Sequence, residues 1–210
     1  MQKNFKDLVL DRRTIRQFLP DPVTDEDICE IISTATHACN SGNEQHWQFI
    51  AIRSDDLKTQ IAEIVRKKAD QLLDEVAIKR SGDRPSYNPQ EFYLQAPVVL
   101  AVATAEGAYQ SKPDLLMLEA EYSEMEIGNL RCRGDLQTLG AVIQLILLAA
   151  WEMGLGGCWM TVPLFARTEL EQLLGIAGGD SLAALIPLGR PASIPSARGR
   201  KRVEDVLRFV

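Results

Sequence analysis

The sequence has little cysteine and almost no histidine, and this scarcity excludes several kinds of site. Its 210 residues include four cysteines and two histidines. No two cysteines form a C-x-x-C pair, and metal sites usually show such short ligand spacings, so we expect no zinc site. A chain of this length buries a core without disulfides. We therefore predict reduced thiols in a cytoplasmic protein.

Long hydrophobic runs are missing as well. The most apolar window, residues 139–151, contains Gln144 and is shorter than the roughly 20 residues that span a bilayer. The first residues lead into a charged amphipathic stretch without the apolar segment of a signal peptide. The sequence therefore predicts a soluble protein with no membrane partner.

Positive charge is in deficit, although not everywhere. Lys and Arg number 23 against 29 Asp and Glu, which gives a net charge of -6. An acidic chain argues against a nucleic-acid partner, because such partners need a basic surface. Two basic clusters nevertheless stand out, and their members are Arg12, Arg13, Arg16, Arg198, Arg200, Lys201 and Arg202. Guanidinium groups bind phosphate in a bidentate manner, so the clusters either converge on one phosphorylated ligand or form separate salt-bridged surface patches.

The signatures of several common enzyme classes are also absent. There is no Walker A sequence and no G-x-S-x-G nucleophile motif. Gly154-x-Gly-Gly follows a predicted helix and leads to a strand, which is the reverse of the dinucleotide-binding fingerprint. Demanding chemistry would therefore have to be carried by a bound cofactor.

What is present is a mixture of helical and strand patterns without a linker, which predicts a single α+β domain over residues 1–210. Thr168-x-x-Glu171 is a capping-box signature, so we expect a helix to begin there. The pattern predicts helices at 24–38, 55–81, 136–153 and 168–175, and strands at 47–52, 96–104, 158–162 and 182–189.

Two further stretches are predicted to lie outside the regular elements. Residues 82–89 have loop composition, which indicates an excursion or a lid. Residues 114–126 contain five acidic residues and no Lys or Arg. This second stretch is predicted to be a solvated face or a mobile segment, with an acidic recognition patch as the alternative.

Five blocks of the sequence resemble the nitroreductase family of flavoproteins. Arg12-Arg-Thr-Ile-Arg-Gln-Phe is similar to the family's R-R-S-x-R-x-F opening, and Ala38-Cys-Asn-Ser-Gly-Asn-Glu-Gln-His-Trp-Gln-Phe to its A-P-S-x-x-N-x-Q-P-W-x-F segment. Ala96-Pro-Val-Val resembles its buried strand, and Gly154-Leu-Gly-Gly-Cys-Trp-Met its G-L-G-x-C-W loop. The fifth block comprises Pro187-Leu-Gly-Arg-Pro and Arg200-Lys-Arg-Val-Glu-Asp-Val. The blocks occur in the family's order and cover nearly the whole chain.

The resemblance implies a nitroreductase-like α+β fold, with a central mixed, mostly antiparallel sheet flanked by helices. It also implies an interlocked homodimer that holds two FMN molecules at the subunit interface. The expected activity is that of an FMN-dependent oxidoreductase, which passes electrons from NAD(P)H through the flavin to a nitroaromatic, quinone or similar small acceptor in a ping-pong cycle. The alternatives are oxidase or flavin-fragmenting chemistry, or a flavin-binding protein without enzymatic activity.

The resemblance also implies roles for individual residues. Arg12 and Thr14 would contact the FMN phosphate and ribityl chain, and Arg16 would lie beside N1 and O2, where a cation stabilises the reduced ring. No side chain is expected to act as the catalytic group, because the flavin carries the chemistry. The further residues expected near FMN are Arg13, Arg198 and Arg200 at the phosphate, Asn43 at the opposite subunit's FMN with Ser41 and Gln45 close by, and Trp159, Met160, Thr161 and Val162 at the ring.

The sequence departs from the family pattern in two places. Cys39, Asn40 and His46 replace the usual Pro, Ser and Pro, and Thr161-Val162 stands where glycines are common. His46 is a candidate proton donor to the substrate, with loop packing as the alternative. These changes leave the arginines in place and put the substrate preference in doubt.

Overall fold

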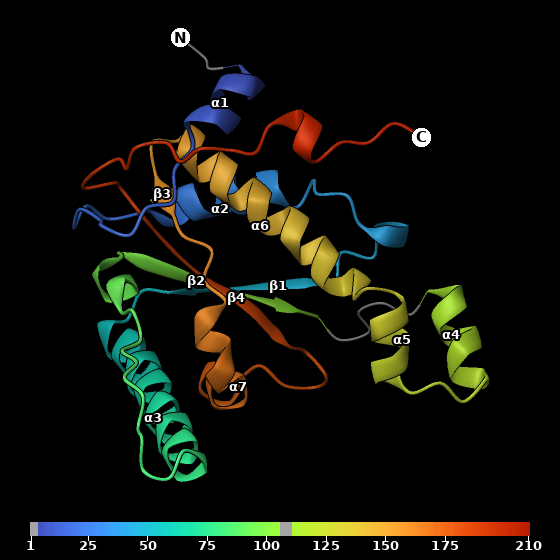
Figure 1. Ribbon diagram of the computed structural model, residues 1–210. Coiled ribbons are helices and arrows are strands. Elements are labelled where there is room, and N and C mark those ends of the chain that lie inside the picture. Colours follow the sequence, from blue (N-terminus) through green and yellow to red (C-terminus); the bar gives the residue numbers. More distant parts are fainter. Residues whose placement is uncertain (1–3, 106–110) are drawn as a thin grey trace.

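A four-stranded sheet organises the computed structural model, which describes residues 4–105 and 111–210 (Figure 1). The strands are β1 (Trp47–Ile52), β2 (Val98–Thr104), β3 (Gly156–Gly157) and β4 (Leu182–Gly189), in the order β1-β2-β4-β3. All three strand pairs are antiparallel, and an isolated parallel bridge joins Thr14 to Gly157. The expected mixed, mostly antiparallel sheet is confirmed.

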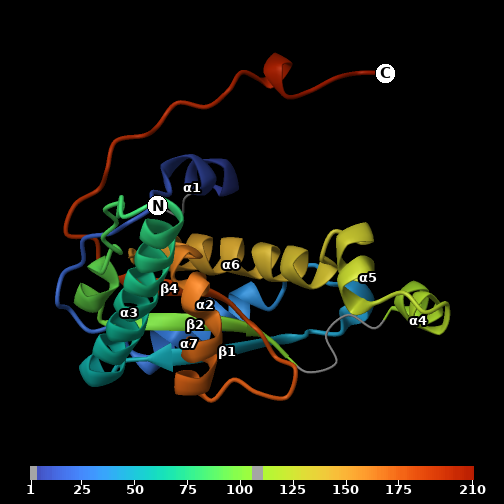
Figure 2. The same ribbon diagram turned by 60° about the horizontal axis from the view of Figure 1, so that its bottom comes forward.

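β2 is buried along its whole length and separates two hydrophobic cores. Alternate residues of a strand point to opposite faces of the sheet. Val98, Leu100 and Val102 accordingly belong to one core, whereas Val99, Ala101 and Ala103 belong to the other. The first core is packed by helices α2 (Asp25–Ala35) and α6 (Gly134–Glu152), and the second by α3 (Asp55–Lys79) and α7 (Arg167–Leu174) (Figure 2).

Helix α6 is the central helix that the sequence predicted. It ends at Glu152, and Gly154 follows with a φ of 76°, a left-handed conformation that glycine adopts without strain. By length and composition α6 alone among the described helices is long and apolar enough to cross a membrane. Its residues Val142, Ile143 and Ile146 are fully or almost fully buried in the first core.

The acidic stretch forms two short helices, α4 (Lys112–Glu119) and α5 (Glu124–Leu130). Asp114 is buried, with 3% of its surface exposed, and its Oδ1 lies 3.0 Å from Nε of Arg131. The prediction of a solvated or mobile stretch is therefore wrong for Asp114, because a partner beyond the stretch neutralises it. The remaining acidic residues are exposed, and they are Glu119, Glu121, Glu124 and Glu126.

Several predicted boundaries are wrong: the helix predicted at 24–38 spans Asp25–Ala35, and the strand predicted at 96–104 spans Val98–Thr104. The strand expected at 158–162 is instead the two-residue β3, after which the N–H of Cys158 donates to the carbonyl of Pro187 and Met160 forms an isolated bridge with Leu185 of β4. A 3-10 turn, Val162–Ala166, follows directly because Pro163 cannot continue a ladder.

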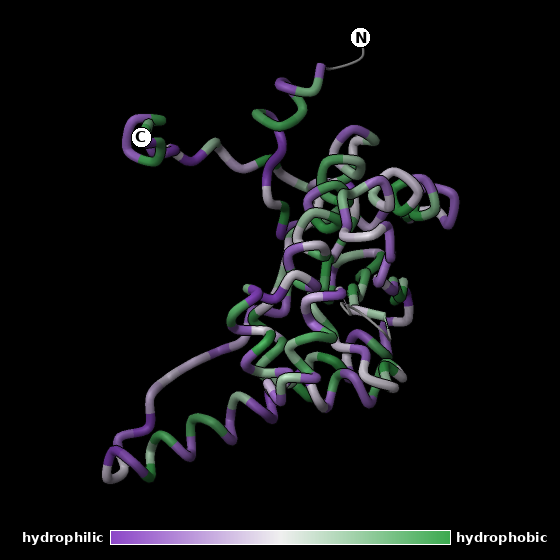
Figure 3. The backbone as a smooth tube through the Cα atoms, turned by 90° about the vertical axis from the view of Figure 1, so that its right-hand side faces the viewer, coloured by the Kyte–Doolittle hydropathy of each residue, from purple (hydrophilic) through white to green (hydrophobic). Residues whose placement is uncertain are grey.

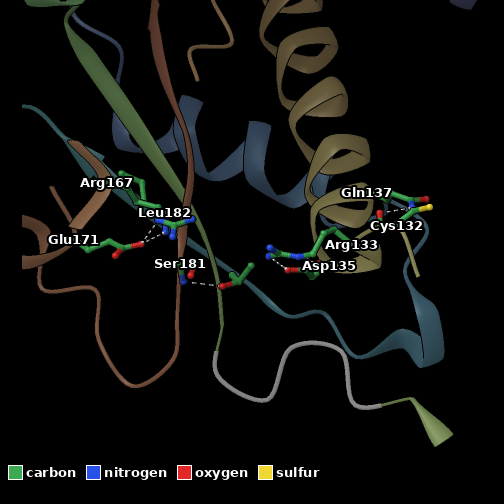
Figure 4. A network of polar contacts seen from close by, with 9 residues as sticks. Cys132, Arg133, Asp135, Gln137, Arg167, Glu171, Ser181 and Leu182 are labelled. Atoms are coloured by element: carbon green, nitrogen blue, oxygen red, sulfur yellow. Dashed lines mark hydrogen bonds and ion pairs between the residues drawn. The ribbon is translucent and has the colours of Figure 1, made fainter. Parts of the chain in front are cut away.

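The capping box expected at residue 168 does not form either. Helix α7 already begins at Arg167, and no side chain caps it. Oε1 of Glu171 instead accepts a hydrogen bond of 2.8 Å from the backbone N–H of Leu182, and the same oxygen lies 3.5 Å from Nε of Arg167 (Figure 4). The Glu171 carboxylate thus joins α7 to the first residue of β4.

The remaining segments surround this framework. Helix α1 (Phe5–Asp11) contacts α6, and short 3-10 turns lie at Ser41–Asn43, Phe92–Gln95 and Val203–Asp205. The chain after β4 leaves the body of the molecule as an extended tail (Figure 2). Its side chains are exposed, including Val206 at 68% and Phe209 at 89%.

Candidate functional site

One member of each basic cluster interacts electrostatically with the other, Arg12 with Arg200. Arg12 ends helix α1, and its backbone N–H donates to the carbonyl of Leu8. Burial lowers the pKa of the Arg12 guanidinium, and the positive charges of Arg200 and Arg13 lower it further, whereas Cys158 acts in the opposite direction. Arg200 of the tail is therefore an electrostatic neighbour of Arg12 at the other end of the chain. A bound anion would relieve this repulsion between like charges.

The other members of the clusters are arranged differently. The Arg13 guanidinium donates to the carbonyl of Leu10 at 2.7 Å, so it caps the C-terminal end of α1. Arg200 donates to the carbonyls of Arg198 and Gly199, at 3.1 and 3.2 Å. Arg202 pairs with Glu204 at 3.0 Å, as the surface-patch alternative expected. Arg12 and Arg200 are thus electrostatic neighbours, whereas Arg202 pairs with Glu204 within the tail.

Arg16 lies at a cavity of about 330 Å³. Its guanidinium carbon is 5.7 Å from the centroid of the Phe92 ring, a cation–π distance. Thr14 and Ile15 place it there, because Ile15 donates to the carbonyl of Gly157 and Thr14 bridges the same residue. The lining of the cavity comprises Arg16, Val65, residues 87–90, Phe92 and residues 158–163. The four expected ring-binding residues, Trp159, Met160, Thr161 and Val162, are all part of it.

Cys158 is a buried thiol in the same wall. Burial raises the pKa of this thiol, while the charges of Arg16 and Arg12 and a hydrogen bond with Arg16 act in the opposite direction. Desolvation is the larger effect, so Cys158 is a neutral thiol at neutral pH. It contacts the arginine that faces the cavity.

The loop at residues 40–46 has an unusual backbone. Gly42, Asn43 and Gln45 have positive φ angles of 62°, 55° and 55°. Asn40 holds the loop, because its Oδ1 accepts a 3.0 Å hydrogen bond from the N–H of Gln45. Non-glycine residues in the left-handed region are strained, and such strain tends to gather at functional sites.

This loop lies apart from the arginines within one chain. Ser41, Gln45 and His46 border a small hollow of about 20 Å³ together with Asp135 and Thr138, near the N-terminal end of α6. Helix α1, which Arg12 ends, packs against α6, and Figure 1 shows it at the C-terminal end of α6, whose 19 residues at 1.5 Å per residue span roughly 28 Å. The structure therefore does not bring Ser41, Asn43 and Gln45 to the cavity that contains Arg16.

His46 has a partner of its own in this loop. Its Nε2 lies 3.2 Å from Oε2 of Glu44, and both side chains are partly buried. It borders the small hollow and not the cavity beside Arg16. This contact accords with the loop-packing alternative.

One wall of the cavity was missed by the motif analysis. Tyr87, Asn88, Pro89 and Gln90 line it, together with Phe92. The sequence indicated an excursion or a lid at 82–89, but not which residues it would face. No spacing rule connects that stretch with residues 158–163, because the contact arises from the return of the chain alongside α3.

Comparisons with known proteins agree on the family. The model described as "Nitroreductase family" matches residues 9–190. The crystal structure of a BluB-like flavoprotein from Clostridium difficile 630 superposes with a TM-score of 0.85 and 30% identity, covering 99% of both chains. YfhC of Bacillus subtilis (strain 168), whose name describes an NAD(P)H nitroreductase, is 24% identical over 95% of this chain and 91% of its own. Iodotyrosine deiodinase of Danio rerio is 28% identical over 95% of this chain and 64% of its own.

Proposed function

The chain belongs to the nitroreductase family, and on that premise we propose that it is an FMN-dependent oxidoreductase that uses NAD(P)H. The observation that carries the proposal is the cavity lined by Arg16 and residues 158–163, because Arg12 interacts electrostatically both with Cys158 of that lining and with Arg200 of the tail. Two neighbouring guanidinium groups, of which Arg12 has a lowered pKa, suit a phosphate, and an adjoining cavity with apolar walls suits a planar ring.

The residues of this chain would share the work as follows. Arg12 and Arg200 would hold the phosphate, with Thr14 and Arg198 beside them, while Arg13 would secure the end of α1. Arg16 would place a fixed positive charge at the edge of the ring, where negative charge develops on reduction. The backbone from Trp159 to Val162 would face the ring, and the buried side chain of Met160 would exclude water from that side.

Bound FMN would supply two-electron transfer between NAD(P)H and a small acceptor such as a nitroaromatic or a quinone. We propose that a second copy of the chain completes the site in a homodimer. The 40–46 loop, which contains Ser41, Asn43 and Gln45, lies near the N-terminal end of α6 and does not line the cavity of its own chain. These residues would therefore serve the FMN of the partner. A cytoplasmic location accords with the use of NAD(P)H.

Anaerobic mixing of the purified, FMN-loaded protein with NADH and with NADPH tests this function. We expect rapid loss of the flavin absorbance with at least one of the two nucleotides, followed by its return when a quinone is added. No loss with either nucleotide would contradict the reductase proposal. The comparison of the two nucleotides also identifies the donor.

A second candidate function is flavin chemistry other than nitro reduction, such as oxidation or flavin fragmentation. The likeness to a BluB-like flavoprotein, together with the altered residues Cys39, Asn40 and His46, favours it. An FMN-loaded protein that no nicotinamide nucleotide bleaches would support this candidate. A non-enzymatic flavin-binding role is the third reading, and turnover of a quinone with NAD(P)H would count against it.

A further inference from the structure

The segment between α3 and Phe92 has no regular structure, yet it is held in place at both ends. Near its start, the Arg84 guanidinium pairs with Asp74 and Asp70 of α3, at 2.7 and 2.9 Å. At its end, Glu91 pairs with Arg66 of the same helix at 2.8 Å. Figure 3 shows this segment returning alongside the projecting α3. Exposed ion pairs are individually weak, but here three of them act on one short stretch.

A ring contact fixes the middle of the segment. Tyr87 meets the edge of Phe165 in a T-shaped arrangement, with ring centroids 6.4 Å apart. Phe165 belongs to the 3-10 turn that follows the expected ring-binding residues. Pro89 is buried and restricts the backbone further. The short stretch from Tyr87 to Gln90 is thereby placed as one wall of the cavity.

This wall and the Cys158–Pro163 wall line the same cavity. The second wall, together with Arg16, is the side assigned to the flavin ring in the proposed function, on which this inference rests. The wall that contains Asn88 and Gln90 therefore borders the space left for the second substrate. Both side chains are exposed in the single chain, so they are free to meet a ligand that enters the cavity.

The chemistry of this lining is selective. Among the described residues that border the cavity, Arg16 alone carries a charge, and none has a carboxylate. Asn88 and Gln90 contribute carboxamides, each with two N–H donors and one carbonyl acceptor. Such a lining suits a neutral or anionic aromatic molecule with oxygen substituents, and it offers no counter-charge to a cationic one.

We propose that Asn88 and Gln90 are the residues that select the electron acceptor, by donating hydrogen bonds to the oxygen atoms of a neutral or anionic aromatic substrate. They touch the substrate and not the flavin. Replacing either residue therefore changes the reaction with an aromatic acceptor and leaves the affinity for FMN intact.

Stopped-flow reoxidation of the FMN-loaded protein, reduced beforehand with dithionite, tests this assignment. The probes are menadione, a neutral naphthoquinone, and ferricyanide, which accepts electrons without being held by amide groups. For Asn88→Ala and for Gln90→Ala we expect the second-order rate constant with menadione to fall about fivefold, the effect of one hydrogen bond between uncharged groups. The rate with ferricyanide and the FMN dissociation constant should change by less than about twofold, as for other surface substitutions.

Gln60→Ala is the matched control, because Gln60 is an exposed carboxamide on α3 that does not line the cavity. An unchanged menadione rate in both Asn88→Ala and Gln90→Ala overturns the assignment, and so does an equal fall with both acceptors. A wild-type protein that takes up no FMN contradicts the proposed function itself, so the two failures are distinguishable.

Discussion

Arg12 and Arg200 lie near opposite ends of the sequence, yet the charge of one lowers the pKa of the other. Local sequence predicted both clusters, since each is dense in arginine, but left open whether they meet. Only the family resemblance favoured convergence on one phosphate. The cavity wall that contains Tyr87 and Asn88 shows what local sequence does not reveal. The loop composition of residues 82–89 was visible in the sequence, but their position across the cavity from residues 158–163 was not.

The arginine assignment predicts a loss of cofactor affinity. Arg200→Ala should weaken FMN binding by about 1.5–3 kcal/mol, the range for a hydrogen bond to a charged group. Fluorescence titration of FMN measures this change. Arg202→Ala is the control, because Arg202 already pairs with Glu204 and should leave the affinity unchanged. Equal FMN affinities for Arg200→Ala and wild type would indicate that the tail is a solvated surface patch and not part of the phosphate site.

Cys158 predicts a pH dependence of stability. Burial raises its pKa in the folded protein above the value of about 8.5 in an unfolded chain. The unfolded state therefore loses this proton first as the pH rises. The contribution of Cys158 to the free energy of unfolding is fully present below the thiol pKa of the unfolded state. It is lost as the pH rises through the thiol pKa of the folded state.

Urea unfolding of wild type and Cys158→Ala, at neutral pH and at a pH above 9, measures this contribution. Wild type should lose more stability on going to the higher pH than the variant does, because the variant has no thiol at this position. Other groups that titrate in this range are common to both proteins and cancel in the comparison. Identical losses in the two proteins would show that the thiol pKa is not raised.

At the scale of elements, β2 and α6 were predictable because their patterns are long and local. The uninterrupted apolar run of β2 agrees with a strand covered on both faces, and the glycine after α6 ends that helix as expected. The capping box at Thr168 failed for a tertiary reason, since Glu171 accepts from the backbone N–H of Leu182 and not from a backbone N–H at its own helix start. β3 was misplaced because regular pairing with β4 ends at Gly157, after which Met160 forms only an isolated bridge before the turn at Pro163.

The rival roles of Glu171 and Thr168 are separable by mutation. Glu171→Ala should destabilise the protein by about 1.5–3 kcal/mol, because it leaves the N–H of Leu182 without its charged acceptor. Thr168→Ala should change the stability by less than about 0.5 kcal/mol, as expected for a surface residue without a capping role. Urea unfolding checks both values. A loss of about 1 kcal/mol for Thr168→Ala would instead indicate a helix cap.

At the scale of the whole molecule, the single chain leaves much apolar surface uncovered. Phe5 in α1 is 74% exposed, and Val206 and Phe209 in the tail are exposed to similar or greater degrees. Large exposed apolar patches mark interaction surfaces. The net charge and composition gave no hint of this, because exposure depends on where the tail runs after β4.

The proposed homodimer therefore predicts a particle of twice the 23.4 kDa chain mass in size-exclusion chromatography with light scattering. Removal of residues 196–210 should shift the protein toward the monomer and weaken FMN binding, since it deletes both Arg198 and Arg200. Arg202→Ala, which alters the tail without shortening it, should remain dimeric. A wild-type monomer at micromolar concentration that nevertheless binds FMN would contradict the shared site.

The central claim is that this fold holds a flavin, and equilibrium titration of the purified protein with FMN tests it most directly. We predict saturable binding at one FMN per chain, with quenching of flavin fluorescence and a yellow protein after removal of free cofactor. A colourless preparation that leaves FMN fluorescence unchanged throughout the titration would contradict the account.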